Sequence, residues 1–258
     1  MNGGHWALDV SSAARSGDGG GVRIALLDSG VERLHPEFKN ASFADDLCFT
    51  TAENGNDPGY AGGLDFFGHG TAVAAVLLEI APAATIGSFR VLGGEAYGRD
   101  EIIRRAALEA IARGYQIIHC SFGASGSPFT MMSFKSWIDA AYLAGVHVVA
   151  ACNNGGPSIR VWPAHFSSVV AVDSSPEIRS DGIQRRNGSI VEFLAQGQRP
   201  RPLPWSNQSS RTISGTSFSA PVVTGLIARI LSVYPGIHPD QMKMALREIA
   251  ERSDGETA

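Results

Sequence analysis

Strand-like and helix-like segments alternate up to residue 151, and this alternation constrains the fold more than any other feature. A continuous apolar run of the kind found in buried strands covers residues 22–27, and residues 85–91, 116–120 and 146–151 are also predicted to be strands. Apolar side chains recur at helical spacing in the intervening residues 69–80, 100–114 and 133–144. Successive strands joined by helices form right-handed crossovers in a parallel sheet. The sequence therefore predicts an α/β fold, with a mostly parallel central sheet and helices on both faces.

Local signals mark the ends of the predicted helices. Pro82 ends the first, because a proline cannot continue the helical hydrogen bonds. Asp100 is a candidate N-cap for the second helix. Gly114 and Gly145 are candidate C-terminal stops for the second and third helices.

Two regions show neither the helical spacing of apolar residues nor a strand-like pattern. Residues 31–68 are expected to form a polar loop, and residues 173–211 to form surface loops. Arginines are frequent in the second region, where they alternate with aspartates and glutamates. A patch for an acidic ligand is one interpretation, but the mixed charges favour an ordinary solvated surface.

Length and charge limit the classes of protein that fit. The 258 residues, 44% of them hydrophobic, are enough for one large domain spanning residues 1–258. The formal net charge of −4 argues against a nucleic-acid partner. The apolar stretches at residues 71–78 and 220–228 are shorter than the roughly 20 residues of a membrane span, so we expect no membrane segment.

The three cysteines, Cys48, Cys120 and Cys152, are too few for a disulfide framework. Reduced thiols in a cytoplasmic protein are the simplest expectation. No apolar segment behind a basic start is found near the N-terminus, so the chain carries no recognisable secretory signal.

The carboxyl ends of the predicted strands are where a parallel sheet binds its ligands. Asp28, residues 121–124 and residues 153–155 lie at these ends. They are therefore candidate site residues before any motif is considered.

Three short segments carry the chemistry. Asp28 ends Ala-Leu-Leu-Asp-Ser-Gly, His69 lies in Gly-His-Gly-Thr, and Ser217 lies in Ser-Gly-Thr-Ser-Phe-Ser-Ala-Pro. Each alone has another explanation. Asp28 could cap a helix or bind a ribose, the Gly-His-Gly segment could be only a turn, and Ser217 could be a helix cap. Together they supply the carboxylate, imidazole and hydroxyl that an activated serine nucleophile requires.

In the order Asp, His, Ser, these segments resemble the subtilisin-like serine proteases, or subtilases. His35-Pro36-Glu37-Phe38, Ser121-Phe122-Gly123 and the segment Ala-Cys-Asn-Asn-Gly-Gly at residues 151–156 also resemble family motifs. The resemblance covers about residues 20–248. It implies a three-layer fold and a catalytic triad of Asp28, His69 and Ser217.

The resemblance further implies a serine endopeptidase that acts through an acyl-enzyme. Its oxyanion donors would be the Ser217 N–H and the Asn154 side chain. Its polypeptide substrate would bind as an extended strand along Ser121, Phe122, Gly123 and Ala124. Asn153 and Val161 occupy positions that are often glycine in the family, so we expect a narrowed pocket that favours small or medium side chains.

Helix ends suit two of the triad residues. His69 begins a predicted helix, whose positive end disfavours a further proton, so we expect a neutral imidazole that can act as a base. Ser217 begins another, and Pro221 is expected to be tolerated in its first turn.

Some family features are missing. Many subtilases hold calcium on a loop inserted in the helix that His69 begins, and residues 69–82 contain no such insertion. We therefore expect no metal there, and no cofactor elsewhere. The chain also lacks the propeptide of secreted members. It is then either a domain of a larger or secreted precursor, or an intracellular enzyme that is restrained in another way.

Alternatives stay open at this stage. One is a dedicated processing protease that cuts a single leader peptide or toxin precursor; another is a catalytically silent peptide-binding module. An α/β-hydrolase esterase is disfavoured, because Ser219 stands where the second glycine of Gly-x-Ser-x-Gly would fall. His119 and His147 are expected to be satisfied core groups, and Cys120 and Cys152 inert core thiols. We expect a monomer.

Overall fold

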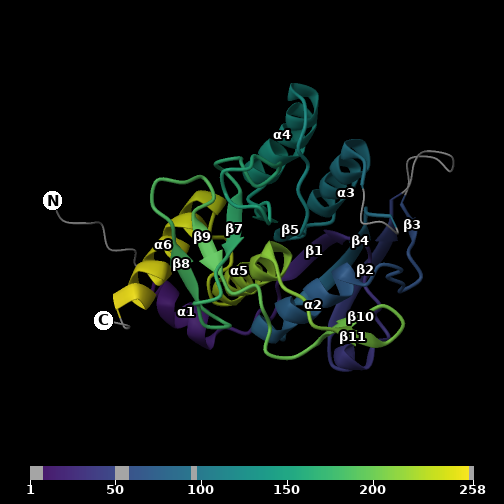
Figure 1. The fold of residues 1–258 in the computed structure, drawn as a ribbon, viewed down its shortest axis with the longest axis horizontal. Helices are drawn as coiled ribbons and strands as arrows, with labels where there is room; N and C mark the ends of the chain where they lie inside the picture. The colour runs from purple at the N-terminus through teal and green to yellow at the C-terminus, as the bar shows by residue number, and fades with distance from the viewer. Residues whose placement is uncertain (1–7, 50–57, 94–97, 256–258) are drawn as a thin grey trace.

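A nine-stranded sheet forms the centre of the computed structural model, which describes residues 8–49, 58–93 and 98–255 (Figure 1). The strands of this sheet are β1 (Arg23–Asp28), β2 (Ser42–Cys48), β3 (Gly59–Tyr60), β4 (Thr85–Arg90), β5 (Ile117–Cys120), β6 (His147–Ala151), β7 (Val170–Ser174), β8 (Ile183–Arg185) and β9 (Phe193–Ala195). Their order is β3-β2-β4-β1-β5-β6-β7-β9-β8. Only the edge strands β3 and β8 pair antiparallel, so the mostly parallel sheet is confirmed.

Helices cover both faces of this sheet (Figure 1). They are α1 (Val10–Ser16), α2 (His69–Ile80), α3 (Asp100–Ala112), α4 (Pro128–Leu143), α5 (Thr216–Val233) and α6 (Pro239–Gly255), with a short 3-10 turn, η1 (Pro36–Phe38). A separate hairpin is made by β10 (Leu203–Trp205) and β11 (Ser209–Arg211).

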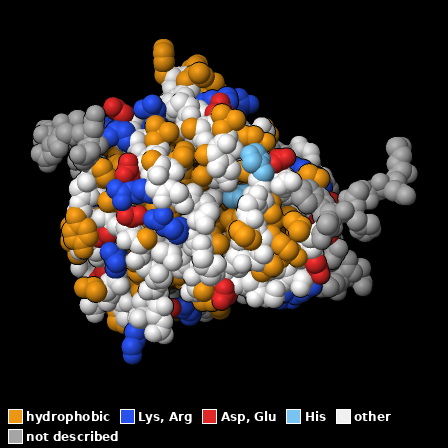
Figure 2. All heavy atoms as spheres, turned by 180° about the vertical axis from the view of Figure 1, so that it is seen from behind, with side chains coloured by type: hydrophobic (Ala, Val, Ile, Leu, Met, Phe, Trp, Pro, Cys, Tyr) orange, Lys and Arg blue, Asp and Glu red, His pale blue; other side chains and the backbone are white. Residues whose placement is uncertain are grey.

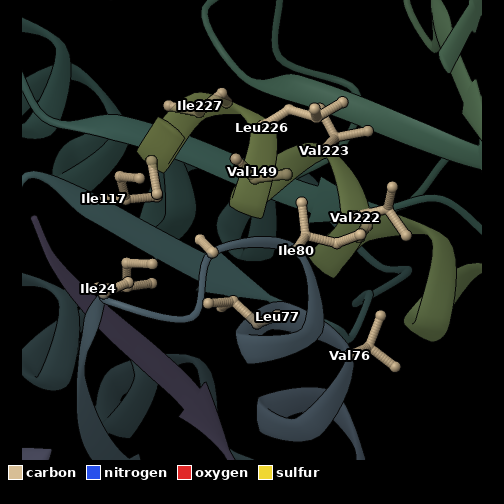
Figure 3. Close-up of a cluster of buried hydrophobic side chains, with 14 of the residues drawn as sticks. Ile24, Val76, Leu77, Ile80, Ile117, Val149, Val222, Val223, Leu226 and Ile227 are labelled. Carbon is tan, nitrogen blue, oxygen red and sulfur yellow. The ribbon is translucent and has the colours of Figure 1, made fainter. Parts of the chain in front are cut away.

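Two hydrophobic clusters separate the three layers. Side chains alternate along β1, so that Ile24 and Leu26 pack with α2 and α5. Ala25 and Leu27 face the other way and pack with α3 and α4. Figure 3 shows the first cluster, in which side chains of α2 and α5 meet those of β1, β5 and β6. The three-layer α/β fold expected from the sequence is therefore confirmed.

Helix α5 runs through the core. It is the one described helix that is long and apolar enough to cross a membrane by length and composition, yet 78% of it is buried inside the protein. Burial against α2 and the sheet accounts for its apolar sequence.

The predicted helix ends are partly right. Gly114 and Gly145 follow α3 and α4 with φ of 72° and 73°, as the stop signals predicted. The N-cap assignment was wrong: Arg99 caps α3, and Asp100 is its first residue, where its charge favours the helix dipole. Helix α4 begins at Pro128, five positions before the predicted start. Its first turns expose Phe129 and so show no core-facing period.

Both regions expected to be loops contain strands. Strand β2 lies within residues 31–68; Asp45 and Asp46 hide its period, and its pairing with β4 shifts register between Phe43 and Asp46. Residues 50–57 of that predicted loop lie outside the described residues. Residues 173–211 contain β8 to β11, each of three residues, which is too short for a period to appear.

The arginines of residues 173–211 are not all solvated. Arg199 is buried, forms an ion pair with Glu79 of α2, and donates a hydrogen bond to the Ser180 carbonyl. Others lie at the surface: Arg179, for example, is 84% exposed and forms an ion pair with Asp181. Figure 2 shows basic and acidic side chains interspersed over one face of the molecule. The solvated-surface interpretation therefore holds for part of this region.

Candidate active site

The order in which successive strands are added to the sheet reverses at β1. Strands β4 and β2 lie on one side of β1, and β5, β6 and β7 on the other. Chain segments that leave the carboxyl ends of strands at such a switch point diverge, which leaves a crevice for a ligand. Asp28 ends β1, Ser121 follows β5, and Cys152 follows β6. The candidate residues from all three strand ends therefore lie at one edge of the sheet.

Asp28 and His69 are joined directly. The Asp28 carboxylate is fully buried, and its Oδ1 and Oδ2 lie 2.8 and 3.1 Å from Nδ1 of His69. Oδ1 also accepts the N–H of Ser29 at 2.7 Å. A carboxylate in this position keeps the His69 proton on Nδ1 and leaves Nε2 to accept another.

The environment of His69 raises its pKa above the usual value. Burial lowers this pKa, but the charge of Asp28, the hydrogen bond to Asp28 and the charge of Asp65 together outweigh burial. The helix dipole considered from the sequence is therefore not the whole electrostatic environment of His69. The Asp28 and Asp65 carboxylates together outweigh burial and raise its pKa.

Asp65 is a site residue that sequence reasoning missed. Its Oδ1 accepts hydrogen bonds from the Ser29 hydroxyl at 2.8 Å and the Gly68 N–H at 2.7 Å. Its Oδ2 accepts from the Thr71 N–H at 2.9 Å and the Thr71 hydroxyl at 2.7 Å. An acid just before a predicted helix is a capping signal that would have indicated it.

Ser217 is the second residue of α5, as predicted. Its hydroxyl donates to the Ser121 carbonyl at 3.1 Å, and the hydrogen bonds of the described residues include none between Ser217 and His69. The ring of Phe218, the next residue, has its centroid 5.5 Å from that of His69. The structure therefore brings the serine and the histidine into one neighbourhood, with the serine hydroxyl turned toward Ser121.

Asn154 lies against the start of α5. Its Oδ1 accepts the Thr216 N–H at 2.9 Å and lies 3.0 Å from the Thr216 hydroxyl. Because the amide oxygen is the acceptor here, the amide nitrogen is left to donate elsewhere. Thr216 is a second residue that sequence reasoning missed: its hydroxyl also donates to the Cys152 carbonyl at 2.8 Å.

The segment expected to pair with a substrate is only partly free. Ala124 exchanges two backbone hydrogen bonds with Trp162, at 2.9 and 2.8 Å, so its N–H and C=O are already used. The Ala124 N–H is therefore not free in this structure, and its expected pairing with a peptide stays a prediction. For Phe122 and Gly123, no backbone-to-backbone hydrogen bond is found within the described residues, so these two keep that capacity.

Val161 lies close to the backbone of Gly123. The side chain of Val161 is buried, and a Cβ added to Gly123 would meet its Cγ2 at 2.9 Å. Asn153 is turned onto its own loop, where its Oδ1 accepts the Gly155 N–H at 2.8 Å. Of the two residues expected to narrow the pocket, Val161 thus contacts the predicted substrate-pairing strand.

The buried thiols and histidines match their expected structural roles in most respects. Burial raises the pKa of Cys120 and Cys152, which makes them poor nucleophiles. Burial lowers the pKa of His147 to about 4, and its Nδ1 has no partner among the described residues. Both ring nitrogens of His119 are hydrogen-bonded.

The region where many subtilases hold calcium does not suit a metal. Helix α2 continues without interruption from His69 to Ile80, so no loop is inserted in it. Glu79, the acid near its end, is paired with Arg199. Within the described residues, no three His, Cys, Asp or Glu side chains are grouped as metal ligands.

A cavity of about 610 Å³ lies elsewhere in the molecule. Residues of α1, α5, α6 and β8 line it, including Ser11, Leu226 and Arg229. None of its lining residues belongs to the crevice described above, which therefore remains the candidate site.

Comparison with known proteins points to one family. The family model for subtilases (peptidase S8) matches residues 19–258. Subtilisin DY from Bacillus licheniformis is 28% identical over 239 residues, which are 90% of this chain and 84% of that protein. Thermitase from Thermoactinomyces vulgaris is 26% identical over 254 residues, 92% of this chain and 84% of that protein.

Solved structures agree with the sequence relatives. Sphericase superposes with a TM-score of 0.75 at 27% identity, over 93% of this chain and 88% of its own. A cold-adapted subtilisin-like serine proteinase superposes with a TM-score of 0.72 at 26% identity, over 90% and 83%. Because the family match spans most of the chain and these structures share its three-layer fold, the chain belongs to the subtilase family of serine endopeptidases.

Proposed function

We propose that this endopeptidase cleaves peptide bonds through a triad of Asp28, His69 and Ser217 and an acyl-enzyme intermediate. The observation that carries the proposal is the hydrogen bond of 2.8 Å from His69 Nδ1 to the buried Asp28 carboxylate. It lies at the same sheet edge where α5 presents Ser217. A buried carboxylate that orients the histidine and stabilises its protonated form is what a serine nucleophile requires.

The reaction proceeds in two halves. The Ser217 hydroxyl turns from the Ser121 carbonyl toward His69 Nε2, which takes its proton as Oγ attacks the peptide carbonyl. His69 then gives that proton to the leaving amine, and the peptide C–N bond breaks to leave an ester on Ser217. Water, deprotonated by His69, attacks the ester and releases the new carboxyl end, and Ser217 regains its proton.

Two donors stabilise the oxyanion. The Ser217 N–H lies in the first turn of α5, where backbone N–H groups have no partner within the helix. The Asn154 amide nitrogen is the second donor, since its oxygen is held by Thr216. Donors fixed in advance stabilise the developing charge without reorganising during the reaction.

Substrate is bound as an extended strand beside Phe122 and Gly123, whose backbone groups supply sequence-tolerant hydrogen bonds. The contact between Val161 and Gly123 supports a pocket suited to small or medium side chains before the scissile bond. A peptide library measures this preference directly. Cleavage mainly after Phe or Tyr would overturn it.

Fluorophosphonate labelling tests the nucleophile. We expect the wild type to be labelled and Ser217→Ala to remain unlabelled. Ser219→Ala is the matched control, because Ser219 is a fully buried serine on the same helix and its loss should leave labelling intact. A folded wild type that stays unlabelled would instead indicate the catalytically silent peptide-binding module.

A further inference from the structure

The nucleophile helix contains an unusual backbone defect. Pro221 lies inside α5 and has no N–H, so the carbonyl four residues earlier, that of Ser217, loses its normal partner in the helix. The expectation that Pro221 lies in the first turn, where no hydrogen bond would be lost, was wrong: Pro221 is the sixth residue of α5, and the carbonyl that loses its partner is that of the nucleophile. A buried carbonyl without a partner is costly, so another donor is needed.

Ser121 supplies that donor. Its hydroxyl donates to the Ser217 carbonyl at 2.8 Å, while its own carbonyl accepts the Ser217 hydroxyl at 3.1 Å. Both polar ends of the nucleophile are therefore held by one residue of the segment after β5. Ser121 is itself buried, so water cannot readily replace its hydroxyl.

His119 orients the Ser121 hydroxyl. His119 Nε2 lies 2.7 Å from Ser121 Oγ, and Nδ1 lies 2.7 Å from the hydroxyl oxygen of Thr224. Ser121 has one hydroxyl hydrogen, and the Ser217 carbonyl takes it, so Ser121 Oγ must accept from His119. His119 then carries its proton on Nε2, and Nδ1 accepts from Thr224.

The surroundings keep this arrangement in one state. His119 is fully buried, and burial lowers its pKa to about 3, so the ring is neutral. The Thr224 hydroxyl hydrogen has two acceptors within reach, the Ala220 carbonyl at 3.1 Å and His119 Nδ1 at 2.7 Å. Because His119 Nδ1 carries no hydrogen, it accepts from Thr224 over the shorter distance. The hydrogen bonds then run in one direction from Thr224 through His119 and Ser121 to the Ser217 carbonyl.

We propose that His119 is a positioning residue for Ser217. His119 holds Ser217 through the Ser121 hydroxyl, and the Thr224 hydroxyl fixes the orientation of the His119 ring. This inference rests on the proposed function, in which Ser217 is the nucleophile. Thr224 and Ser217 lie two turns apart on α5, so the chain of hydrogen bonds ties both ends of this helical segment to β5. Its catalytic effect is to fix the nucleophile backbone, whose N–H is also an oxyanion donor.

The first test separates kcat from KM. His119→Leu leaves the Ser121 hydroxyl free to rotate, so we expect kcat per folded enzyme to fall on the order of 10²-fold with KM little changed, as for other small displacements of a reacting group. His119→Gln offers an oxygen to Thr224 and an N–H to Ser121, and should recover most of the loss. The second-order rate of fluorophosphonate labelling should follow kcat.

His147→Leu is the control for stability. His147 is also a buried histidine of the sheet, on the neighbouring strand β6, and its pKa is lowered by burial as that of His119 is. Among the described residues, no hydrogen bond joins it to Ser121 or Ser217. Its loss should lower the melting temperature without lowering kcat of the folded protein. A His119→Leu variant that loses stability but keeps its kcat would overturn the proposal.

A double mutant tests whether His119 acts through Ser121. In a Ser121→Ala background, His119→Leu should have little further effect on kcat, because the group it orients is absent. If His119→Leu lowers kcat by the same factor in the Ser121→Ala background as in the wild type, the proposal is overturned. If His119→Leu does not fold, Thr224→Val gives the same test: a several-fold loss of kcat is expected, and an unchanged kcat contradicts the proposal. Labelling of Ser217→Ala would instead refute the proposed function itself.

Discussion

The N-terminal ends of α2 and α5 carry His69 and Ser217, the two side chains that react in the proposed mechanism, yet these helix ends are stabilised in different ways. Each helix follows a glycine with positive φ, Gly68 at 93° and Gly215 at 143°, and neither glycine position provides a side-chain cap. At α2 the buried carboxylate of Asp65 accepts the free N–H groups. At α5 the neutral amide oxygen of Asn154 accepts the Thr216 N–H.

This difference matches what each side chain does in the proposed mechanism. His69 would become positively charged on taking a proton, and the carboxylates of Asp28 and Asp65 raise its pKa. Attack by Ser217 would create a negative oxygen, which a carboxylate in place of the Asn154 amide would oppose. The charged cap lies at the end that gains positive charge, and the neutral cap at the end that gains negative charge.

Asn154→Ala tests the neutral end and has the largest expected effect. Loss of the amide nitrogen removes one oxyanion donor, and loss of the oxygen frees the Thr216 N–H. We expect kcat to fall about 10²–10³-fold with KM nearly unchanged, which is the loss that follows removal of such a donor in subtilisin, a relative of this protein. Steady-state kinetics on a peptide substrate measure it.

Asn153→Ala is the matched control, since this neighbouring amide bonds to its own loop through the Gly155 N–H. It should leave kcat within a few-fold of the wild type. Equal losses in the two variants would mean that Asn154 acts by holding the loop and not as a donor.

The sequence indicated the residues of the proposed triad more readily than the residues that bond to them. Asp28, His69 and Ser217 each stand at a strand or helix end, and such ends are visible in local patterns. Thr216 was missed because its contact with Asn154 spans 62 residues. Asp65 also bonds to Ser29, 36 residues away, although its place before a predicted helix was a local signal. The helix dipole considered from the sequence takes no account of Asp28, 41 residues from His69, whose charge helps raise the pKa of His69.

Errors in the predicted fold have the same cause. Strands β1, β4, β5 and β6 are largely buried on both faces and were all predicted from the sequence. Strand β2 carries two acids that are satisfied only in three dimensions: Asp45 pairs with Arg23 and Arg113, and Asp46 accepts the Gly63 N–H. No local pattern reveals such compensation.

Alanine substitutions at Gly68 and Gly215 test the two helix ends individually, and we expect effects of intermediate size. A Cβ on Gly68 would lie 2.5 Å from the Trp205 ring and 2.7 Å from the Ser206 N, so Gly68→Ala should lower the free energy of unfolding by about 2–4 kcal/mol. A Cβ on Gly215 would meet Asn154 Oδ1 at 3.0 Å, so Gly215→Ala should displace the amide and mainly lower kcat. Urea unfolding and kinetics together measure both. If both variants lose stability and kcat in the same proportion, the two helix ends do not differ in the way described.

Asp65→Asn tests the charged end and has the smallest expected effect on activity at its optimum. Neutral His69 is the form that accepts the serine proton, so kcat/KM rises as pH rises through the pKa of His69. The Asp65 charge stabilises protonated His69 and raises that pKa, and asparagine lacks this charge while keeping an oxygen acceptor. The acid limb of the kcat/KM profile should therefore move to lower pH, and the variant should gain activity relative to the wild type in acid.

Asp46→Asn controls for the loss of a buried carboxylate, because Asp46 is equally buried but is no cause of the His69 shift. An acid limb that stays in place in Asp65→Asn, or moves equally in Asp46→Asn, would mean that Asp65 shapes the helix end without setting the charge of the base.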